Sequence, residues 1–442
     1  MIPSREDYTA TLESAMAYSS DRRTLASDVS LREVWAWSMY DFANSGYTTV
    51  VITAVFSAYF VGAVAHRAPW AALAWPAALS LSYLLTILTA PPIGAWADAH
   101  AAKKQLLFYS TVGCVVFTAG LWFAAPGAVV LALVLVGVSN YFFSTGENLI
   151  AAFLPELASS HAMGRVSGWG WAFGYLGGLV SLGACLAYIS WASARGQSAT
   201  EFVPATMVIT AVLFAVFATP TFLFLKERAQ PQPKLESPWA RLLRTFHESA
   251  RFADLRRFLV CILFYQAGIM IVIQFAAIYA QQVMHFSQQQ TIVLILVVNV
   301  TAAVGAFAFG YLQDAIGHMR SMVLILLGWI VMIGTAYFAH DAPTFWVAAN
   351  LAGLCMGSSQ AAGRAVVGFL SPRAREAEFF GLWGFAVKAA SIVGPLTYGG
   401  VVLFFAGNYR IGILTAAAYF VIGLALLAGI DVERGRKAAL LG

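Results

Sequence analysis

The sequence predicts an all-α polytopic membrane protein whose twelve transmembrane helices form two six-helix bundles. Three observations support this fold class: the composition, a pattern that occurs twice, and a series of apolar segments. Of the 442 residues, 60% are hydrophobic and 11% are charged, whereas soluble proteins carry about 25% charged residues. Because so few charges cannot cover a water-facing surface, much of the surface must lie in lipid, and a large soluble enzyme is excluded.

The repeated pattern lies at matching places in the two halves of the chain. Residues 94–98 read Gly-Ala-Trp-Ala-Asp, and residues 310–314, which follow 216 positions later, read Gly-Tyr-Leu-Gln-Asp. Two-fold internal repeats are a common plan of secondary transporters. Asp98 and Asp314 are placed to cap a neighbouring helix, whose N-terminus favours negative charge; a purely topological role is the alternative. The expected gating loops contain Gly94, Asp98, Lys103, Lys104, Gly310, Asp314 and Arg320.

Spanning a bilayer takes about 20 apolar residues per helix, and twelve segments meet that requirement. Their expected limits are 34–62, 71–96, 105–125, 127–151, 166–191, 203–225, 257–282, 289–313, 321–339, 343–367, 377–405 and 410–430. The expected units are a flexible cytoplasmic tail (1–33), an N-terminal bundle (34–225), a basic cytoplasmic linker (226–256), a C-terminal bundle (257–430) and a cytoplasmic tail (431–442). Basic and apolar residues alternate at helical spacing from Trp239 to Phe258, which indicates a helix lying on the membrane surface.

The distribution of the net charge of +5 predicts the orientation of the chain. With the N-terminus inside, 21 Lys and Arg residues fall on the inner side and three, Arg67, Arg195 and Arg410, on the outer side. Cytoplasmic loops of membrane proteins carry such an excess. We therefore expect a multi-pass protein of the cytoplasmic (inner) membrane with both termini in the cytoplasm. The basic excess then reflects orientation and contact with anionic lipid, and not a nucleic-acid partner.

Motifs for cofactors, metals and nucleotides are absent from the sequence. The four cysteines, Cys114, Cys185, Cys261 and Cys355, lie in apolar runs without a C-x-x-C pair, which is typical of small core residues. P-loop, H-E-x-x-H and Gly-x-Ser-x-Gly patterns are missing, and the seven histidines do not cluster. We therefore expect no cofactor, no metal, and neither an enzyme nor an ATP-driven transporter.

Three places in the sequence carry a resemblance to a known family. They read Trp-Ser-Met-Tyr-Asp-Phe-Ala-Asn-Ser-Gly-Tyr at 37–47, Phe-Leu-Pro-Glu at 153–156 with Gly-Arg-Val-Ser-Gly at 164–168, and Glu-Ala-Glu-Phe-Phe-Gly at 376–381. With six plus six helices, the chain resembles the major facilitator superfamily, and within it the branch containing the fungal vacuolar amino-acid effluxers. The resemblance implies the major facilitator fold, loops that latch the halves on the cytoplasmic side, and an amino acid as substrate. Members of that branch often carry an acidic residue where this chain has Gln266, so a titratable group that the family implies is missing.

Asp41 is the leading candidate for substrate binding or coupling. It lies about 12 Å into the first segment, and a carboxylate at that depth costs a few kcal/mol unless it meets a partner or a wet cavity. Asn44, Ser45 and Thr48 share its helical face, which predicts a polar stripe along the central cavity. Asp41 would bind a substrate amine or take up a proton; a structural hydrogen-bonding role near the inner mouth is the alternative.

The tenth segment offers a second candidate. Arg364 lies one turn after Gln360, and an arginine within a membrane helix can hold a carboxylate with two hydrogen bonds. It would bind a substrate carboxylate, or pair with Asp41 or Glu147 in one conformation. The alternative is an arginine that snorkels to the cytoplasmic interface.

The fourth segment carries Ser144, Glu147 and Asn148 on one face. The 216-residue offset places Ser144 and Asn148 at the positions of Gln360 and Arg364, as expected for a site between two halves. Glu147 is a candidate proton carrier or an interfacial carboxylate in water. The lysine at 388, in the eleventh segment, is expected to counter an acidic partner, either in the site or in a structural ion pair.

A glycine stripe lies on the fifth segment. Gly170, Gly174 and Gly178 are spaced by four, which lets membrane helices pack closely. A place in the interface between the moving halves is the alternative. No strand precedes these glycines, so a nucleotide loop is not indicated.

We therefore predict a secondary active transporter that binds a small solute between the halves and works by alternating access. We expect an amino acid or similar zwitterion, protons as a candidate coupling ion, contact with membrane lipid, and a monomer. The candidate site residues are Asp41, Asn44, Ser45, Thr48, Ser144, Glu147, Asn148, Gln266, Gln360, Arg364 and Lys388. A non-transporting assembly factor or sensor on the same fold is the alternative; an intramembrane enzyme would need a nucleophile–base pair that the sequence lacks.

Overall fold

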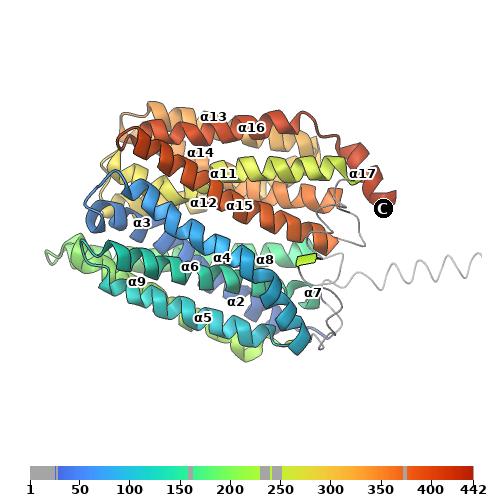
Figure 1. The fold of residues 1–442 in the computed structure, drawn as a ribbon, viewed down its shortest axis with the longest axis horizontal. Helices are drawn as coiled ribbons and strands as arrows, with labels where there is room; N and C mark the ends of the chain where they lie inside the picture. Colours follow the sequence, from blue (N-terminus) through green and yellow to red (C-terminus); the bar gives the residue numbers. More distant parts are fainter. Residues whose placement is uncertain are drawn as a thin grey trace, which may run out of the picture.

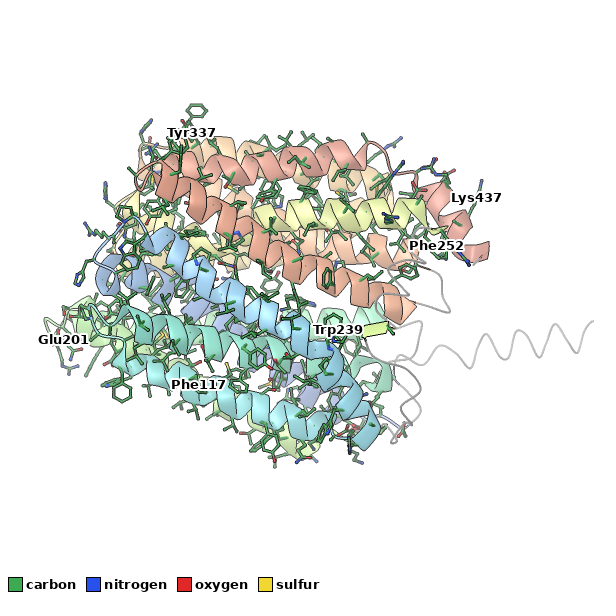
Figure 2. The ribbon with its side chains drawn as sticks, viewed as in Figure 1. Phe117, Glu201, Trp239, Phe252, Tyr337 and Lys437 are labelled. Atoms are coloured by element: carbon green, nitrogen blue, oxygen red, sulfur yellow. The ribbon has the colours of Figure 1, made fainter. Side chains whose placement is uncertain are left out.

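The computed structural model describes residues 25, 28–157, 163–228, 239–240, 251–371 and 376–441. Its helices run side by side in two stacked halves, the first coloured blue to green and the second yellow to red (Figure 1). Glu201 and Tyr337 lie toward one end of the bundle, and Trp239, Phe252 and Lys437 toward the other (Figure 2). We call the end near Glu201 and Tyr337 the far end, and the end near Trp239 the linker end.

The twelve predicted spans all correspond to helices. The first half contains α2 (Leu31–Tyr47), η1 (Thr48–Ala54), α3 (Phe56–Tyr59), η2 (Phe60–Val64), α4 (Ala71–His100), α5 (Lys103–Gly120), η3 (Leu121–Phe123), α6 (Val129–Ala151), α7 (Leu154–Leu157), α8 (Met163–Ser193) and α9 (Ala199–Phe224). The second half contains α11 (Ala253–Gln282), α12 (Gln288–Ile316), α13 (His318–Phe338), α14 (Ala342–Leu370), α15 (Glu376–Phe404), α16 (Tyr409–Leu427) and α17 (Val432–Leu441). Within the described residues, eleven spans are long and apolar enough to cross a membrane. The remaining one, α14, has 29 residues and a more polar middle. The predicted fold class is confirmed.

The linker prediction needs one correction. Residues 253–258, which we expected in a helix on the membrane surface, form the first turns of the spanning helix α11. Trp239 and Ala240 are helical, and residues 241–250 lie outside the described part of the chain. The segment expected as a C-terminal tail contains α17, where Arg436 donates a hydrogen bond to the carbonyl of Phe369 (2.9 Å).

The first span is not a continuous α-helix. Its middle, η1, is a π-helix, and a second π-helical turn, η2, follows α3. Six β-branched residues in a row, from Thr48 to Thr53, explain the weak α-helical geometry, because their side chains crowd the preceding turn. Short π-helical segments inside α-helices occur frequently at functional sites.

The internal duplication is visible in the packing of the helices. The hydroxyl of Tyr40 lies against Gly146, and the hydroxyl of Tyr265 lies against Gly363, where a Cβ atom would collide with it. The glycines are 217 positions apart and the tyrosines 225. The two halves therefore repeat one helix contact, and Gln266 follows Tyr265 as Asp41 follows Tyr40.

The same repeat holds one helix further along the chain. A Cβ at Gly177 would collide with the backbone of Phe42, and a Cβ at Gly394 with the backbone of Ala267. These positions again differ by 217 and 225. Close backbone contact joins the first and fifth helices of each half, as small residues allow in membrane bundles.

The two halves meet along two seams and at the far end. Helix α4 packs on α15, α8 packs on α12, and α11 contacts η1 and α3. A Cβ at Gly399 would collide with the backbone of Ala72, at the start of α4, so the halves are in close contact there. At the linker end, the described ion pairs, such as that of Lys103 with Glu156, join groups of one half or of the first linker residues.

Candidate functional site

The two halves share an ion pair inside the bundle. The ammonium nitrogen of Lys388, on α15, lies 2.7 Å from Oε2 of Glu147, on α6. The side chain of Lys388 is 18% exposed and that of Glu147 is 41% exposed. The same nitrogen lies 5.5 Å from the ring centre of Tyr83, on α4. Pairing is what makes two charges tolerable among membrane helices, because either charge alone would be costly there.

Helix α6 adds buried polar groups on the face that carries Glu147. Asn140 donates a hydrogen bond to Ser82 on α4 (2.5 Å). Its Oδ1 atom and the hydroxyl of Ser144 are buried without a partner among the described residues. Buried polar atoms are nearly always satisfied, so such atoms indicate water or a ligand. Asn148, also predicted in the site, is exposed.

The predicted stripe on the first span faces the fifth span of its own half. A Cβ at Gly170 would meet the carboxylate of Asp41, and a Cβ at Gly174 would meet the hydroxyl of Ser45. Asp41 and Ser45 are half-buried. Thr49, which was not predicted, contacts the third glycine of the α8 stripe in the same way. The glycine stripe thus serves close packing between α2 and α8, as predicted.

The other two predicted residues of the first span differ in burial. Asn44 is 6% exposed, and Thr48 is half-buried at the start of η1. Side-chain neighbours for the stripe could not be deduced from the sequence, because a helical wheel gives a face but not the helix opposite it.

Helix α11 carries two buried glutamines. Gln266, which was predicted, is 3% exposed, and its Oε1 atom is without a partner among the described residues. Gln274, which was not predicted, is 1% exposed. Both its amide nitrogen and its amide oxygen are buried without a hydrogen-bond partner among the described residues. The signal that could have identified Gln274 is an amide side chain within an apolar run.

Helix α14 places Gln360 in a half-buried position. The side chain of Arg364 lies outside the described part of the structure, so its predicted carboxylate contact stays a prediction. One turn earlier, Ser359 accepts a hydrogen bond from the indole of Trp329 (2.8 Å).

The first of the two predicted gating loops binds the start of the linker. The backbone N–H groups of Lys103 and Lys104, at the N-terminus of α5, donate to the carboxylate of Glu227 at 2.6 and 3.1 Å. The N-terminus of α5 thus receives the carboxylate of Glu227. Lys103 also pairs with Glu156 at 3.0 Å, and the ammonium of Lys104 donates to the carbonyl of Leu225 at 2.6 Å.

The structure locates the remaining residues of the predicted loops only in part. The side chains of Asp98 and Asp314 lie outside the described part of the structure. Gly94 and Gly310 lie within α4 and α12, and Arg320 is exposed on α13.

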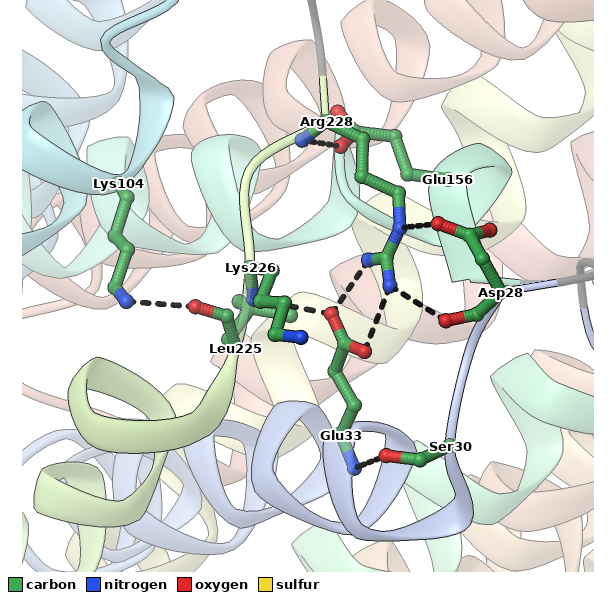
Figure 3. Close-up of polar contacts among 8 residues, drawn as sticks. All are labelled: Asp28, Ser30, Glu33, Lys104, Glu156, Leu225, Lys226 and Arg228. Carbon is green, nitrogen blue, oxygen red and sulfur yellow. Dashed lines mark hydrogen bonds and ion pairs between the residues drawn. The ribbon is translucent and has the colours of Figure 1, made fainter.

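A charge cluster surrounds Arg228 at the linker end (Figure 3). Its guanidinium binds both carboxylate oxygens of Glu33 and, at 2.7 Å, Asp28, while its backbone N–H donates to Glu156 (2.8 Å). The hydrogen bond from Arg228 holds the pKa of the Asp28 carboxyl below its usual range, and the two carboxylates raise the pKa of Arg228. The cluster fastens the start of α2 to the end of α9.

Known sequences match most of the chain. The family described as vacuole effluxer Atg22-like matches residues 74–440. A Bacillus subtilis protein called uncharacterized MFS-type transporter YxiO is 27% identical over 409 residues, which cover 90% of this chain and 94% of that protein. Autophagy-related protein 22 of Yarrowia lipolytica is 25% identical over 343 residues, which cover 69% of this chain but only 57% of the fungal protein.

Solved structures share the fold. A bacterial homologue of the human lysosomal transporter Spinster, in an inward-facing and unoccupied conformation, aligns with a TM-score of 0.65 at 14% identity and covers 93% of this chain and 97% of that chain. The nucleoside transporter NupG aligns with a TM-score of 0.65 at 15% identity and covers 90% and 99%. A D-xylose–proton symporter gives a TM-score of 0.64 at 15% identity, with 91% and 99% covered.

Proposed function

We propose that this chain, which belongs to the vacuole effluxer Atg22-like family, is a secondary active transporter of a small zwitterionic solute such as an amino acid. Its relatives and structural neighbours are multi-pass transporters of the major facilitator type, and not enzymes. The observation that carries the proposal is the pair of opposite charges, Glu147 and Lys388, contributed by the two halves.

A zwitterion fits this pair chemically. Its ammonium group can meet Glu147 and its carboxylate can meet Lys388, so both charges stay neutralised while the solute is bound. Separating the pair without a solute would leave two charges unpaired within the membrane, which is costly. The pair therefore supports binding between the halves rather than within one of them.

The proposed site extends beyond the pair. The hydroxyl of Ser144 and Oε1 of Gln266, which have no partner among the described residues, add hydrogen-bonding capacity on α6 and α11. We further propose that Asp41 and Arg364 act in binding or coupling, and that a proton is the coupling ion. The remaining members of the proposed site are Asn44, Ser45, Thr48, Asn148 and Gln360.

The distribution of basic residues supports an orientation in the membrane. On that basis we propose that the linker end and both termini lie in the cytoplasm, with the cytoplasmic membrane as the location. In that orientation the close contact of Gly399 with Ala72 lies on the outer side. We propose that the chain works as a monomer, because a single chain contains both halves, and that basic loops contact anionic lipid.

Solute exchange in proteoliposomes tests the proposal. Vesicles loaded with unlabelled L-alanine, or with another member of an amino-acid panel, should take up the labelled solute by counterflow. Glu147→Gln and Lys388→Met should each reduce uptake at least about tenfold, a loss of roughly 1.4 kcal/mol. Lys437→Met, an exposed lysine on α17, is the matched control and should leave uptake unchanged.

The opposite result would favour the non-transporting alternative. The zwitterion proposal fails if the folded protein exchanges no solute of the panel. It also fails if Glu147→Gln and Lys388→Met both leave the rate of uptake unchanged. Repeating the uptake with an imposed pH gradient tests proton coupling separately: an unchanged rate of accumulation would exclude it.

A further inference from the structure

We propose that Glu147 and Tyr83 form a subsite for a primary ammonium group, and that Lys388 fills this subsite in the empty protein as a tethered substitute for the solute amine. The inference rests on the proposed transport function and names the group that the site recognises. It begins from the position of one nitrogen atom. The ammonium of Lys388 lies between an acceptor on α6, at 2.7 Å, and an aromatic face on α4, at 5.5 Å.

These two neighbours are the groups that recognise an ammonium ion. A carboxylate accepts charge-assisted hydrogen bonds from it, and an aromatic face within about 6 Å attracts it electrostatically. Neither neighbour depends on the four-carbon stem of a lysine. A free primary amine of a solute carries the same charge and the same three donors, so it would satisfy Glu147 and Tyr83 equally well.

The subsite is reachable at the carboxylate. The side chain of Glu147 is 41% exposed, while Lys388 is 18% exposed and Tyr83 is buried. Among the described residues, Lys388 is the group that pairs with this carboxylate. An incoming amine can therefore approach the carboxylate of Glu147 while Lys388 is still paired with it. The amine can then replace the lysine without an intermediate in which the carboxylate is unpaired.

Exchange of one ammonium for another avoids the main energetic cost. Removing one partner of an ion pair within the membrane is unfavourable, because a charge is left uncompensated. Here the amine of the solute pairs with Glu147, and the released ammonium of Lys388 must pair with another anion. A carboxylate on the same solute supplies it, which gives a reason for preferring zwitterions to simple amines or simple acids.

One variant, Lys388→Met, separates the subsite from its tethered occupant. In Lys388→Met the competitor is removed but the carboxylate and the ring remain. Because a site that is occupied internally binds with reduced apparent affinity, n-propylamine should bind this variant at least about tenfold more tightly than the native protein. The readout is thermal stabilisation of the purified protein against ligand concentration, with Lys437→Met as the matched control.

Three solutes and three further variants make the test specific. The native protein should be stabilised by L-alanine more than by n-propylamine or propionate. Glu147→Gln combined with Lys388→Met should abolish amine binding. Tyr83→Phe should keep it, because the aromatic face remains, while Tyr83→Leu in the Lys388→Met background should weaken it roughly tenfold.

The outcomes distinguish this inference from the transport proposal. If Lys388→Met binds n-propylamine no better than the native protein, or if the double variant still binds it, the subsite is refuted even when L-alanine counterflow is intact. If the amine binds as expected but no solute is exchanged by the native protein, the ammonium subsite stands and the transport proposal falls.

Discussion

Arg434 binds Asp254 with two hydrogen bonds, from Nε to Oδ2 at 2.7 Å and from Nη2 to Oδ1 at 2.6 Å. This joins α17, which follows the last span, to the first turn of α11. The first half contains the equivalent pair, in which Arg228, after α9, binds Glu33 in the first turn of α2. Both carboxylates are 3% exposed. Each half is thus fastened where its last helix ends and its first helix begins.

Loss of the ion pair between Arg434 and Asp254 should destabilise the protein. Arg434→Leu removes the guanidinium, and among the described residues the backbone N–H of Asp431, at 3.0 Å, then remains as the hydrogen-bond donor to the buried Asp254 carboxylate. We expect the free energy of unfolding to fall by about 1–3 kcal/mol, measured as a lower melting temperature of the purified protein. Asp254→Asn, added to Arg434→Leu, should recover part of the loss, since the unpaired charge is gone. An unchanged melting temperature for Arg434→Leu would contradict a structural role for this pair.

Asp28 should make stability depend on pH in the acid range. Its folded pKa is lowered by the hydrogen bond from Arg228, so its contribution is present above the unfolded pKa, which is about 3.9. The contribution is lost as the pH falls through the lower folded pKa. The melting temperature of Asp28→Asn should lie below that of the native protein at pH 7, and the difference should shrink as the pH falls below about 4. A difference that stays constant as the pH falls through the acid range would show that Asp28 acts without its charge.

The repeated glycine contacts should respond to substitution in the same way in both halves. Gly177→Ala and Gly394→Ala place a Cβ into the backbone of the neighbouring helix, which should cost about 1–3 kcal/mol of unfolding free energy. The chain offers matched controls on the same helices. At Gly183 and Gly400, also 217 positions apart, a Cβ meets nothing within 4 Å. Alanine there should be neutral or stabilising, by up to about 1 kcal/mol. Equal effects at all four positions would mean that the close contacts carry no strain.

The spans and the duplication could be predicted because their signals are local. A run of apolar residues identifies a membrane helix wherever it packs, and the Gly-x-x-x-Asp pattern reveals the repeat without any knowledge of contacts. The offset read from residues 94–98 and 310–314 is within one position of the spacing between Gly146 and Gly363.

The partners within the site could not be predicted in the same way. Glu147 and Lys388 lie 241 positions apart on different halves, and only tertiary packing brings them together. The sequence suggests Arg364 as a partner of Glu147, and for Lys388 it predicts an acidic partner without identifying it. The ring of Tyr83 gave no signal at all, because an aromatic residue in an apolar helix is ordinary.

Gln274 should raise the energy of the conformation seen here. Both of its amide atoms are buried without a partner among the described residues, at a position eight residues before the far end of α11. Burying an amide without hydrogen bonds costs about 1–3 kcal/mol, so Gln274→Leu should increase the melting temperature of the purified protein. It should also slow solute exchange, because stabilising one conformation of an alternating carrier hinders its conversion to the other.

Gln281 provides the matched control for that substitution. It lies two turns later on the same helix, and its amide donates to Gln288 at 2.7 Å. Gln281→Leu removes an existing hydrogen bond and leaves Oε1 of Gln288 without its donor. The substitution should therefore lower the melting temperature or leave it unchanged. If Gln274→Leu also lowers the melting temperature, the amide of Gln274 must have a partner, such as an ordered water, and its burial does not disfavour this conformation.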